Sequence, residues 1–315
     1  MRIDVHAHVW TDDYLDLLDR YGKTDTATQR GTGAGLGGEL DARFELMDSV
    51  GVTHQVLSPA PQSPHFADPE HALHAARFVN DQYAEVVRRW PGRFLAFVSL
   101  PLPHVDLALA ELARGLDELG MVGACATTTV LDRSIADPAF DPVFAELDRR
   151  GSVLYVHPSG VGAGSELITE HRLTWSIGAP IEDTVAIMRL ILAGVPSRHP
   201  RMRILASHLG GALPMLLQRA DNQVGWEAPD TPEKPSAAAR RMWFDSVGHG
   251  HVPALRAAVE SFGADRIVLG TDFPYEAGDL FRTAVTYVEH SGLPADQARR
   301  ILDTNAPALL GLAAL

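Results

Sequence analysis

The 315-residue chain contains a single cysteine, Cys125, and lacks the features of secreted and membrane proteins. One cysteine cannot form an internal disulfide. Because Cys125 lies in the apolar run MVGACA, we interpret it as a buried thiol rather than a catalytic one. No apolar run reaches the roughly 18–20 residues of a membrane span, and Met1 leads into a strand-like segment without the regions of a signal peptide. We therefore expect a cytoplasmic protein.

Basic residues are scarce relative to acidic ones. The chain has 27 Lys and Arg against 40 Asp and Glu, which gives a formal net charge of −13. This imbalance argues against nucleic acid or an anionic membrane as a partner, and an anionic substrate would need its own local arginines. The remaining composition, 46% hydrophobic and 21% charged residues, is typical of a globular protein with a large core and excludes disorder of the whole chain.

Short β-branched runs alternate with longer stretches of helical periodicity, which is the pattern of repeated βα units. We predict eight strands, at residues 2–9, 53–58, 94–100, 122–127, 152–157, 203–208, 241–247 and 266–271. Eight parallel strands close a barrel, and 315 residues suit one (β/α)8 (TIM) barrel. Because no break resembles a linker, we expect residues 1–315 to form a single domain.

A Gly- and Thr-rich segment, at about residues 21–39, follows the first strand and carries little that could be buried. Its Gly33, Gly35 and Gly38 match the dinucleotide signature G-x-G-x-x-G. That signature requires a strand directly before it, whereas polar residues precede this segment, so we reject the match. We interpret the segment as a mobile insertion loop over the barrel mouth, where substrate lids commonly lie.

Histidines and a carboxylate occur at the predicted strand ends. In the first strand, strict alternation places Asp4, His6 and His8 on one face. Three later strands end in VLYVHPSG with His157, in ILASHLGG with His208, and in IVLGTDFPY with Asp272. Since the carboxyl ends of parallel barrel strands open onto one face, these side chains should converge on one pocket.

Neutral imidazoles with one carboxylate suit a divalent ion. We expect His6, His8, His157 and Asp272 to bind one zinc ion, with a coordination position left for water or substrate. The cation would acidify that water or polarise a substrate oxygen, while His208 orients or deprotonates what is bound. In a second His-x-His motif, His249 lies in a predicted loop where it could contact substrate, and we expect no second metal there. The other histidines are expected to be ordinary core or surface residues: His54, His65, His71, His74, His104, His171, His199, His251 and His290.

These motifs resemble those of a known family. The similarity is to the amidohydrolase superfamily, in particular its non-oxidative decarboxylase branch, typified by aminocarboxymuconate-semialdehyde decarboxylase. It rests on the His-x-His of His6 and His8, YVHP at His157, SHLGGALP at His208 and LGTDFPY at Asp272, and it runs from Met1 to the terminal NAPALLGL. The resemblance implies a divalent metal, zinc or manganese, on the equivalents of His6, His8, His157 and Asp272, with His208 beside the metal-bound water.

The resemblance also implies substrate-binding residues and a homodimer or higher homo-oligomer. Two arginines that hold substrate carboxylate have counterparts in Arg43, in ARFELMDSVGV, and Arg219, in GGALPMLLQR, the latter offered across a dimer interface. A guanidinium can hold a carboxylate through two parallel hydrogen bonds. Trp175, in LTWSIGAPIEDT, corresponds to a pocket-lining tryptophan. The alternatives are a solvated helix residue for Arg43, an exposed partner of Asp221 or another nearby acid for Arg219, and simple packing for Trp175.

Two departures from the family patterns bear on the reaction. Many superfamily hydrolases use a carbamylated lysine to bridge two metals, but the ends of the fourth and fifth predicted strands carry no lysine. A binuclear hydrolytic centre is therefore disfavoured. Aromatic-acid decarboxylases of this branch often have Glu-x-His where this chain has His-x-His, so the substrate stays open between an open-chain enal acid and a ring acid.

We predict a metal-dependent decarboxylase, a carbon–carbon lyase, that acts on an unsaturated or aromatic carboxylic acid. Protonation of the carboxyl-bearing carbon, by Asp272 or by metal-bound water with His208, would let the carbon–carbon bond break. Arg43 and Arg219 would orient the carboxylate, and Asp245 would be a further polar residue of the pocket. The alternative is a metal-dependent amidohydrolase, lactonase or hydratase that uses a metal-bound hydroxide. A structural metal protein is disfavoured because its site would be closed.

Overall fold

A ring of eight parallel strands forms the centre of the molecule in a computed structural model, which describes residues 1–32 and 35–312. Within these residues the strands are β1 (Ile3–His8), β2 (His54–Ser58), β3 with β4 (Phe94–Ala96 and Val98–Ser99), β5 (Ala124–Thr127), β8 (Val153–His157), β9 (Arg203–Ala206), β10 (Trp243–Asp245) and β11 (Ile267–Val268). Each lies inside a strand predicted from the sequence, so those predictions are confirmed. A short antiparallel pair, β6 (Thr129–Val130) and β7 (Arg133–Ser134), lies outside the ring.

Backbone hydrogen bonds at two seams close the ring. Strand pairing gives the orders β1-β2-β3 and β11-β10-β9-β8-β5-β4. At the first seam, β3 and β4 are one strand interrupted at Phe97, whose N–H donates to the Leu57 carbonyl at 3.0 Å. At the second seam, the Val5 N–H donates to the Leu269 carbonyl at 2.9 Å, and the Asp272 N–H donates to the His6 carbonyl at 2.9 Å. The fold is a (β/α)8 barrel, as predicted.

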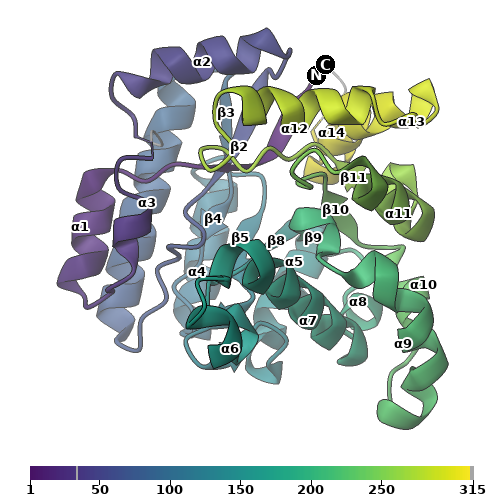
Figure 1. Cartoon of the computed structure of the whole chain (residues 1–315). Helices are drawn as coiled ribbons and strands as arrows, with labels where there is room; N and C mark the ends of the chain where they lie inside the picture. The colour runs from purple at the N-terminus through teal and green to yellow at the C-terminus, as the bar shows by residue number, and fades with distance from the viewer. Residues whose placement is uncertain (33–34, 313–315) are drawn as a thin grey trace.

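Helices surround the strands, and the last helix contacts the first strand, β1 (Figure 1). The helices are α1 (Asp12–Arg20), α2 (Glu39–Ser49), α3 (Pro69–Arg89), α4 (Val105–Asp117), α5 (Asp141–Arg150), α6 (Glu166–Thr169), α7 (Ala179–Leu192), α8 (Val195–Arg198), α9 (Leu213–Glu227), α10 (Pro235–Ala239), α11 (Val252–Phe262), α12 (Asp279–Glu289), α13 (Ala295–Arg299) and α14 (Asn305–Leu310). Two short turns matter for the site, η4 (Thr174–Gly178) and η5 (His208–Gly210). No helix in the described part of the chain is long and apolar enough to cross a membrane.

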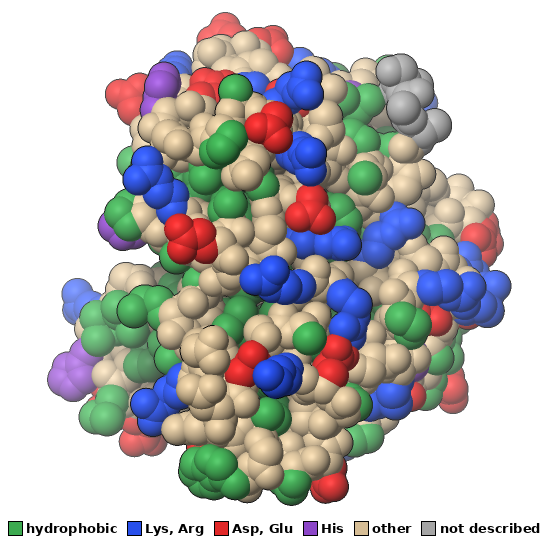
Figure 2. Space-filling view, turned by 90° about the vertical axis from the view of Figure 1, so that its right-hand side faces the viewer, with side chains coloured by type: hydrophobic (Ala, Val, Ile, Leu, Met, Phe, Trp, Pro, Cys, Tyr) green, Lys and Arg blue, Asp and Glu red, His purple; other side chains and the backbone are tan. Residues whose placement is uncertain are grey.

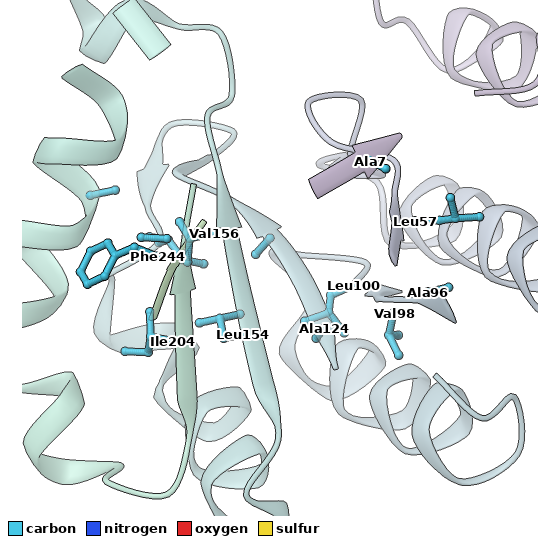
Figure 3. Close-up of a cluster of buried hydrophobic side chains, with 14 of the residues drawn as sticks. Ala7, Leu57, Ala96, Val98, Leu100, Ala124, Leu154, Val156, Ile204 and Phe244 are labelled. Atoms are coloured by element: carbon cyan, nitrogen blue, oxygen red, sulfur yellow. The ribbon is translucent and has the colours of Figure 1, made fainter. Parts of the chain in front are cut away.

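The strands bury both of their faces. Side chains that point outward, such as Leu57, Leu154 and Phe244, pack against the helices in the larger apolar cluster, part of which Figure 3 shows. Side chains that point inward, such as Val56 and Tyr155, form a second cluster inside the ring. Because successive strand residues face opposite sides, an apolar residue at nearly every position is what a barrel strand requires.

A bulge in β1 changes which side chains face the barrel interior. Asp4 pairs with Gln55, but Ala7 pairs with Leu57, so three steps along β1 match two steps along β2. The expectation that Asp4 shares a face with His6 and His8 is therefore wrong. The Asp4 carboxylate instead accepts hydrogen bonds from the Gln55 side chain at 2.7 Å and the Thr271 hydroxyl at 2.6 Å.

The Gly- and Thr-rich segment begins after α1 and ends in α2. It contains a short turn, η1 (Thr26–Thr28), and the Gln29 amide nitrogen donates to the Tyr275 hydroxyl at 2.7 Å. Gly33 of the G-x-G-x-x-G match lies outside the described residues. Since α1 and η1 separate β1 from this match, no strand leads directly into it. That the segment acts as a lid stays a prediction.

Charges of both signs mix on the surface. Figure 2 shows one face on which Lys and Arg side chains form a band between Asp and Glu side chains. The formal net charge of −13 therefore does not give this face a single sign.

Candidate active site

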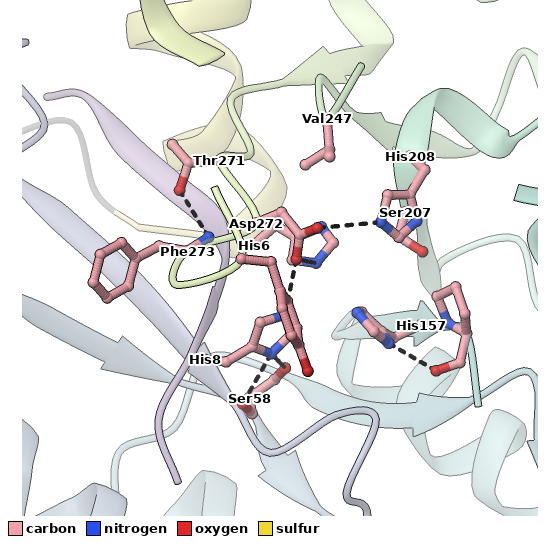
Figure 4. Close-up of polar contacts among 12 residues, drawn as sticks. His6, His8, Ser58, His157, Ser207, His208, Val247, Thr271, Asp272 and Phe273 are labelled. Carbon is pink, nitrogen blue, oxygen red and sulfur yellow. Dashed lines mark hydrogen bonds and ion pairs between the residues drawn. The ribbon is translucent and has the colours of Figure 1, made fainter. Parts of the chain in front are cut away.

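Four of the five residues predicted to converge at the strand ends meet in one cluster. One ligand atom from each of His6, His8, His157 and Asp272 lies within 4.8 Å of the others, and all four residues are buried. His6 lies within β1, His8 and His157 end β1 and β8, and Asp272 follows β11 (Figure 4). Residues from the two ends of the chain meet here because β1 and β11 are neighbours in the ring.

The far side of each imidazole in this cluster contacts an oxygen. His6 Nδ1 lies 2.7 Å from Asp245 Oδ2, His8 Nδ1 lies 3.3 Å from the Ser58 carbonyl, and His157 Nδ1 lies 2.8 Å from the Pro158 carbonyl. Each contact fixes a tautomer in which Nδ1 carries the proton. The Nε2 lone pairs are thereby left for the centre of the cluster.

Atoms at this centre lack hydrogen-bond partners. Among the described residues, His6 Nε2, His8 Nε2 and Asp272 Oδ1 are buried without one. Asp272 Oδ1 lies 3.2 Å from His6 Nε2 and 3.3 Å from His8 Nε2. Three imidazole nitrogens and one carboxylate oxygen fit a zinc or similar divalent ion, which would satisfy these atoms.

The charge states of the cluster favour a cation. Burial lowers the pKa of His8 to about 4 and lowers the pKa of His157 well below its usual value, so both are neutral and have free lone pairs. Burial would raise the pKa of Asp272, but His6 and His208 hold it well below its usual value. Burial would also lower the pKa of His6, but the carboxylates of Asp245 and Asp272 raise it to about 9. A metal ion would therefore compete with a proton at His6.

His208 lies beside the cluster, and its catalytic role stays a prediction. Its Nε2 is 3.7 Å from Asp272 Oδ2, and its Nδ1 is 2.9 Å from Asp183 Oδ2. Burial would lower the pKa of His208, but hydrogen bonds to the two carboxylates raise it well above its usual value. These contacts favour the protonated form of His208, which can present an N–H toward the cluster. Its backbone has a φ of +49°, and Asp272 has a φ of +60°, both sparsely populated conformations that concentrate at functional sites.

Asp183 is a residue that sequence reasoning missed. It lies on α7 rather than at a strand end, and it is buried. Its second oxygen accepts from the Ser207 hydroxyl at 2.8 Å. Burial raises the pKa of Asp183 to about 6, while the contact with His208 favours its charged form. A search for polar residues at the ends of strands could not identify Asp183, because it lies on a helix.

Asp245 occupies a different place from the one expected. It is fully buried and does not line the cavity. One oxygen contacts His6, and the other accepts from the backbone N–H groups of His208 at 2.9 Å and Val247 at 3.0 Å. Asp245 therefore orients the side chain of His6 and the backbone of His208.

A cavity of about 590 Å³ opens beside the cluster. Trp175, on η4, lines it, and its ring stacks on Tyr275 with centroids 6.4 Å apart and an interplanar angle of 25°. That Trp175 binds substrate stays a prediction. The lining is mostly apolar, with polar groups from the cluster at one side: His157, Trp175, Ser176, Ala179, Pro180, His208, Leu209, Gly211, Val247, Gly248, His249, Ala254, Asp272 and Tyr275. A mostly apolar recess with a few convergent polar groups is typical of a small-molecule site.

The two predicted arginines do not line this cavity. Arg43, on α2, is buried on the helix-facing side of the barrel. Its Nε donates to Gln55 Oε1 at 2.6 Å, and its Nη1 donates to the His8 carbonyl at 3.1 Å. This position contradicts the expectation that Arg43 holds the substrate carboxylate. It also contradicts the alternative that Arg43 is a solvated helix residue. Arg219 is exposed on α9, and Asp221 instead accepts from Ser236 at 2.6 Å.

The chain is similar to curated proteins over most of its length. A family profile described as Amidohydrolase matches residues 3–312. The chain is 31% identical over 289 residues to gamma-resorcylate decarboxylase from Rhizobium radiobacter, covering 83% of this chain and 86% of that protein. It is 29% identical over 303 residues to 2-amino-3-carboxymuconate-6-semialdehyde decarboxylase from Dictyostelium discoideum, covering 89% of this chain and 83% of that protein.

Solved structures share the fold. The 5-carboxyvanillate decarboxylase from Sphingomonas paucimobilis has a TM-score of 0.86 at 26% identity, covering 99% of both chains. A dihydroxybenzoic acid decarboxylase from a Polaromonas species, solved with bound manganese and the inhibitor 2-nitroresorcinol, has a TM-score of 0.87 at 25% identity, covering 100% of this chain and 98% of that one.

Proposed function

Since the chain belongs to the amidohydrolase family, we propose that it is a metal-dependent, non-oxidative decarboxylase of a planar unsaturated or aromatic carboxylic acid. The observation that carries the proposal is the position of the cluster: two of its four buried ligand residues, His157 and Asp272, line a mostly apolar cavity that Trp175 and Tyr275 also line. The similarity to proteins named as decarboxylases supports the same reaction.

His6, His8, His157 and Asp272 would hold one divalent ion. We favour zinc, because three neutral imidazoles and one carboxylate suit it, with manganese as the alternative. Manganese is the metal in the Polaromonas neighbour. When bound, the ion would stabilise negative charge on an oxygen next to the carbon that loses its carboxyl group. Measuring the metal content of the purified protein tests the assignment.

His208 is the proposed catalytic acid. Its Nε2–H would transfer a proton to the carboxyl-bearing carbon. A π electron pair of the substrate forms the new C–H bond, the bond to the carboxylate then breaks, its electron pair returns to the π system, and carbon dioxide leaves. Asp272 is a poorer acid because its low pKa keeps it ionised. Asp183 positions His208 and stabilises its charged form, and neutral His208 would recover its proton from water.

The cavity walls suit a flat acid. The faces of Trp175 and Tyr275 offer a planar surface, and Val247 and Leu209 exclude water from the reacting carbon. An acid seated here would put its carboxyl group near His208. The low dielectric would strengthen its interactions with charged groups at the cluster.

We also propose that the chain works as a dimer in which Arg219 serves the neighbouring pocket. Arg219 lies on α9 near large exposed apolar side chains, including Met215 at 84% and Trp226 at 70% exposure. Such side chains are enriched at interfaces. Mixing inactive Arg219→Ala and His208→Ala chains should restore activity in exchanged dimers, and an absence of rescue would count against the arrangement.

The reaction is tested by separating carbon dioxide release from acid formation. Metal-loaded protein is incubated with salicylate-type acids, muconate-type acids and lactones. We expect carbon dioxide from at least one acid, and a loss of about 10²-fold or more in His208→Gln with metal content unchanged. Acid release from lactones without carbon dioxide would instead support a hydrolase.

A further inference from the structure

The β10–α11 loop brings a second histidine–carboxylate pair to the cavity. His249 lines the cavity, and its Nδ1 lies 2.6 Å from Glu276 Oε1. Glu276 is 2% exposed, whereas the His249 side chain is 70% exposed. The carboxylate of this pair is therefore buried, whereas its imidazole is largely exposed.

The position of His249 leaves its Nε2 available. Nδ1 lies in ion-pair contact with Glu276, and no hydrogen bond is found for Nε2 among the described residues. The backbone has a φ of +49°, a conformation that costs free energy in a residue other than glycine and is retained where the surroundings enforce it. An ordinary surface histidine needs neither this backbone nor a buried carboxylate.

Charge favours an anionic ligand at His249. The contact with Glu276 raises the pKa of His249 above its usual value, and nearby Asp272 also raises it while His208 lowers it. His249 therefore carries a proton over a wider pH range than a free histidine. Among the described residues that line the cavity, His249 is the cationic side chain besides His208, since neither Arg43 nor Arg219 lies there.

We propose that His249, held by Glu276, is a specificity-determining residue that binds a second carboxylate of the substrate, at a distance from the one that is lost. The substrate class would then be a planar dicarboxylic acid. Its reacting carboxyl group lies by His208, its plane lies against Trp175, and its second carboxylate accepts a hydrogen bond from His249 Nε2. The inference rests on the proposed function, since it assumes that an acid occupies this cavity.

Binding measurements test the inference independently of turnover. Calorimetry on the metal-loaded protein compares benzoate with isophthalate and terephthalate. We expect at least one dicarboxylate to bind about 10- to 100-fold more tightly than benzoate, as for a hydrogen bond to a charged group. His249→Gln should reduce this preference to within about 3-fold while leaving benzoate binding unchanged. His251→Gln is the matched control, because His251 is an exposed histidine two residues away that does not line the cavity.

A second variant distinguishes a role of His249 in ligand recognition from a role in the stability of its loop. Glu276→Gln keeps the side-chain shape but removes the charge behind His249. Its dicarboxylate preference should therefore persist at pH 5.5, where a free histidine is protonated, and fall below that of the wild type at pH 7.5. Equal affinities for all three acids in the wild type would overturn the inference, as would a His249→Gln variant that melts earlier but keeps the preference. If the protein releases carbon dioxide from monocarboxylic acids but shows no preference for dicarboxylates, the proposed function holds and the inference is refuted.

Discussion

Replacing Asp245 with asparagine should weaken metal binding without unfolding the protein. Asp245 Oδ1 accepts from the backbone N–H groups of His208 and Val247, while Oδ2 contacts His6 Nδ1. In the variant, the two backbone N–H groups keep the carbonyl oxygen in the Oδ1 position. The new NH₂ group must then face His6 Nδ1, where two donors would meet.

His6 can relieve this conflict only by changing tautomer. Its Nδ1 would then accept from the introduced amide, and its proton would move to Nε2, the atom that faces the cluster. The cluster would lose one of its three imidazole lone pairs unless that proton were displaced. Changes of such supporting residues typically reduce metal affinity by about 10- to 100-fold, or roughly 1.4–2.8 kcal/mol. We expect the same range here.

Competition with a chromophoric chelator measures the zinc affinity of each variant. Asp183→Asn is the matched control, because it removes the same charge beside a histidine, His208, that is not expected to bind the metal. Its zinc affinity should stay within about 3-fold of the wild type. If Asp245→Asn binds zinc as tightly as Asp183→Asn and the wild type, the assigned tautomer of His6 is wrong. Thermal melting of the metal-free proteins excludes unfolding as the cause.

Four other predictions follow from the same contacts. Asp183→Asn should lower kcat at neutral pH by about 10²-fold. Because the folded-state pKa of His208 is raised, the kcat of the wild type should fall as the pH rises through that pKa. In Asp183→Asn, the same fall in kcat should occur at lower pH. Arg43→Met should cost about 1–3 kcal/mol in denaturant unfolding for each acceptor that it leaves unpaired, the Gln55 side-chain oxygen and the His8 carbonyl, with KM unchanged in the residual folded enzyme. His6→Ala should abolish stoichiometric metal in elemental analysis. Metal-free protein should bind benzoate at least about 10-fold more weakly in calorimetry than loaded protein does.

The strands and the ligand set were predictable because both depend on short-range patterns. Apolar β-branched runs mark barrel strands wherever both faces are buried, and residues at their carboxyl ends must meet once the barrel closes. The bulge in β1 was not predictable, since strict alternation is the default and only the pairing with β2 reveals the extra residue. Asp183 was missed because its contact depends on how α7 packs against the end of β9.

The sequence of α2 indicates where Arg43 lies, but the family resemblance pointed to a different role for it. Leu40, Arg43 and Met47 are the buried residues of α2, and their spacing of three and four places them on one helix face. That spacing alone predicts that Arg43 points toward the barrel, between apolar neighbours. Burial lowers the pKa of Arg43 to about 9, and its guanidinium lies against Phe94 and Phe273 with centroid distances of 5.1 Å and 4.6 Å. The resemblance suggested a binding role, but helix geometry was the better guide to its position.

The balance of charge around the cavity sets the order in which ligands can bind. The buried carboxylates of Asp183, Asp245 and Asp272 lie within two contacts of one another through His6 and His208. An organic acid that binds here before a cation would add negative charge beside three buried carboxylates, which protonated His6 and His208 offset only in part and which water screens little. A divalent ion changes the sign of that interaction at the cluster, because it neutralises Asp272 and presents positive charge to the cavity. The metal should therefore bind first and the acid second, which is why benzoate affinity should depend on metal content in a chain whose net charge is already −13.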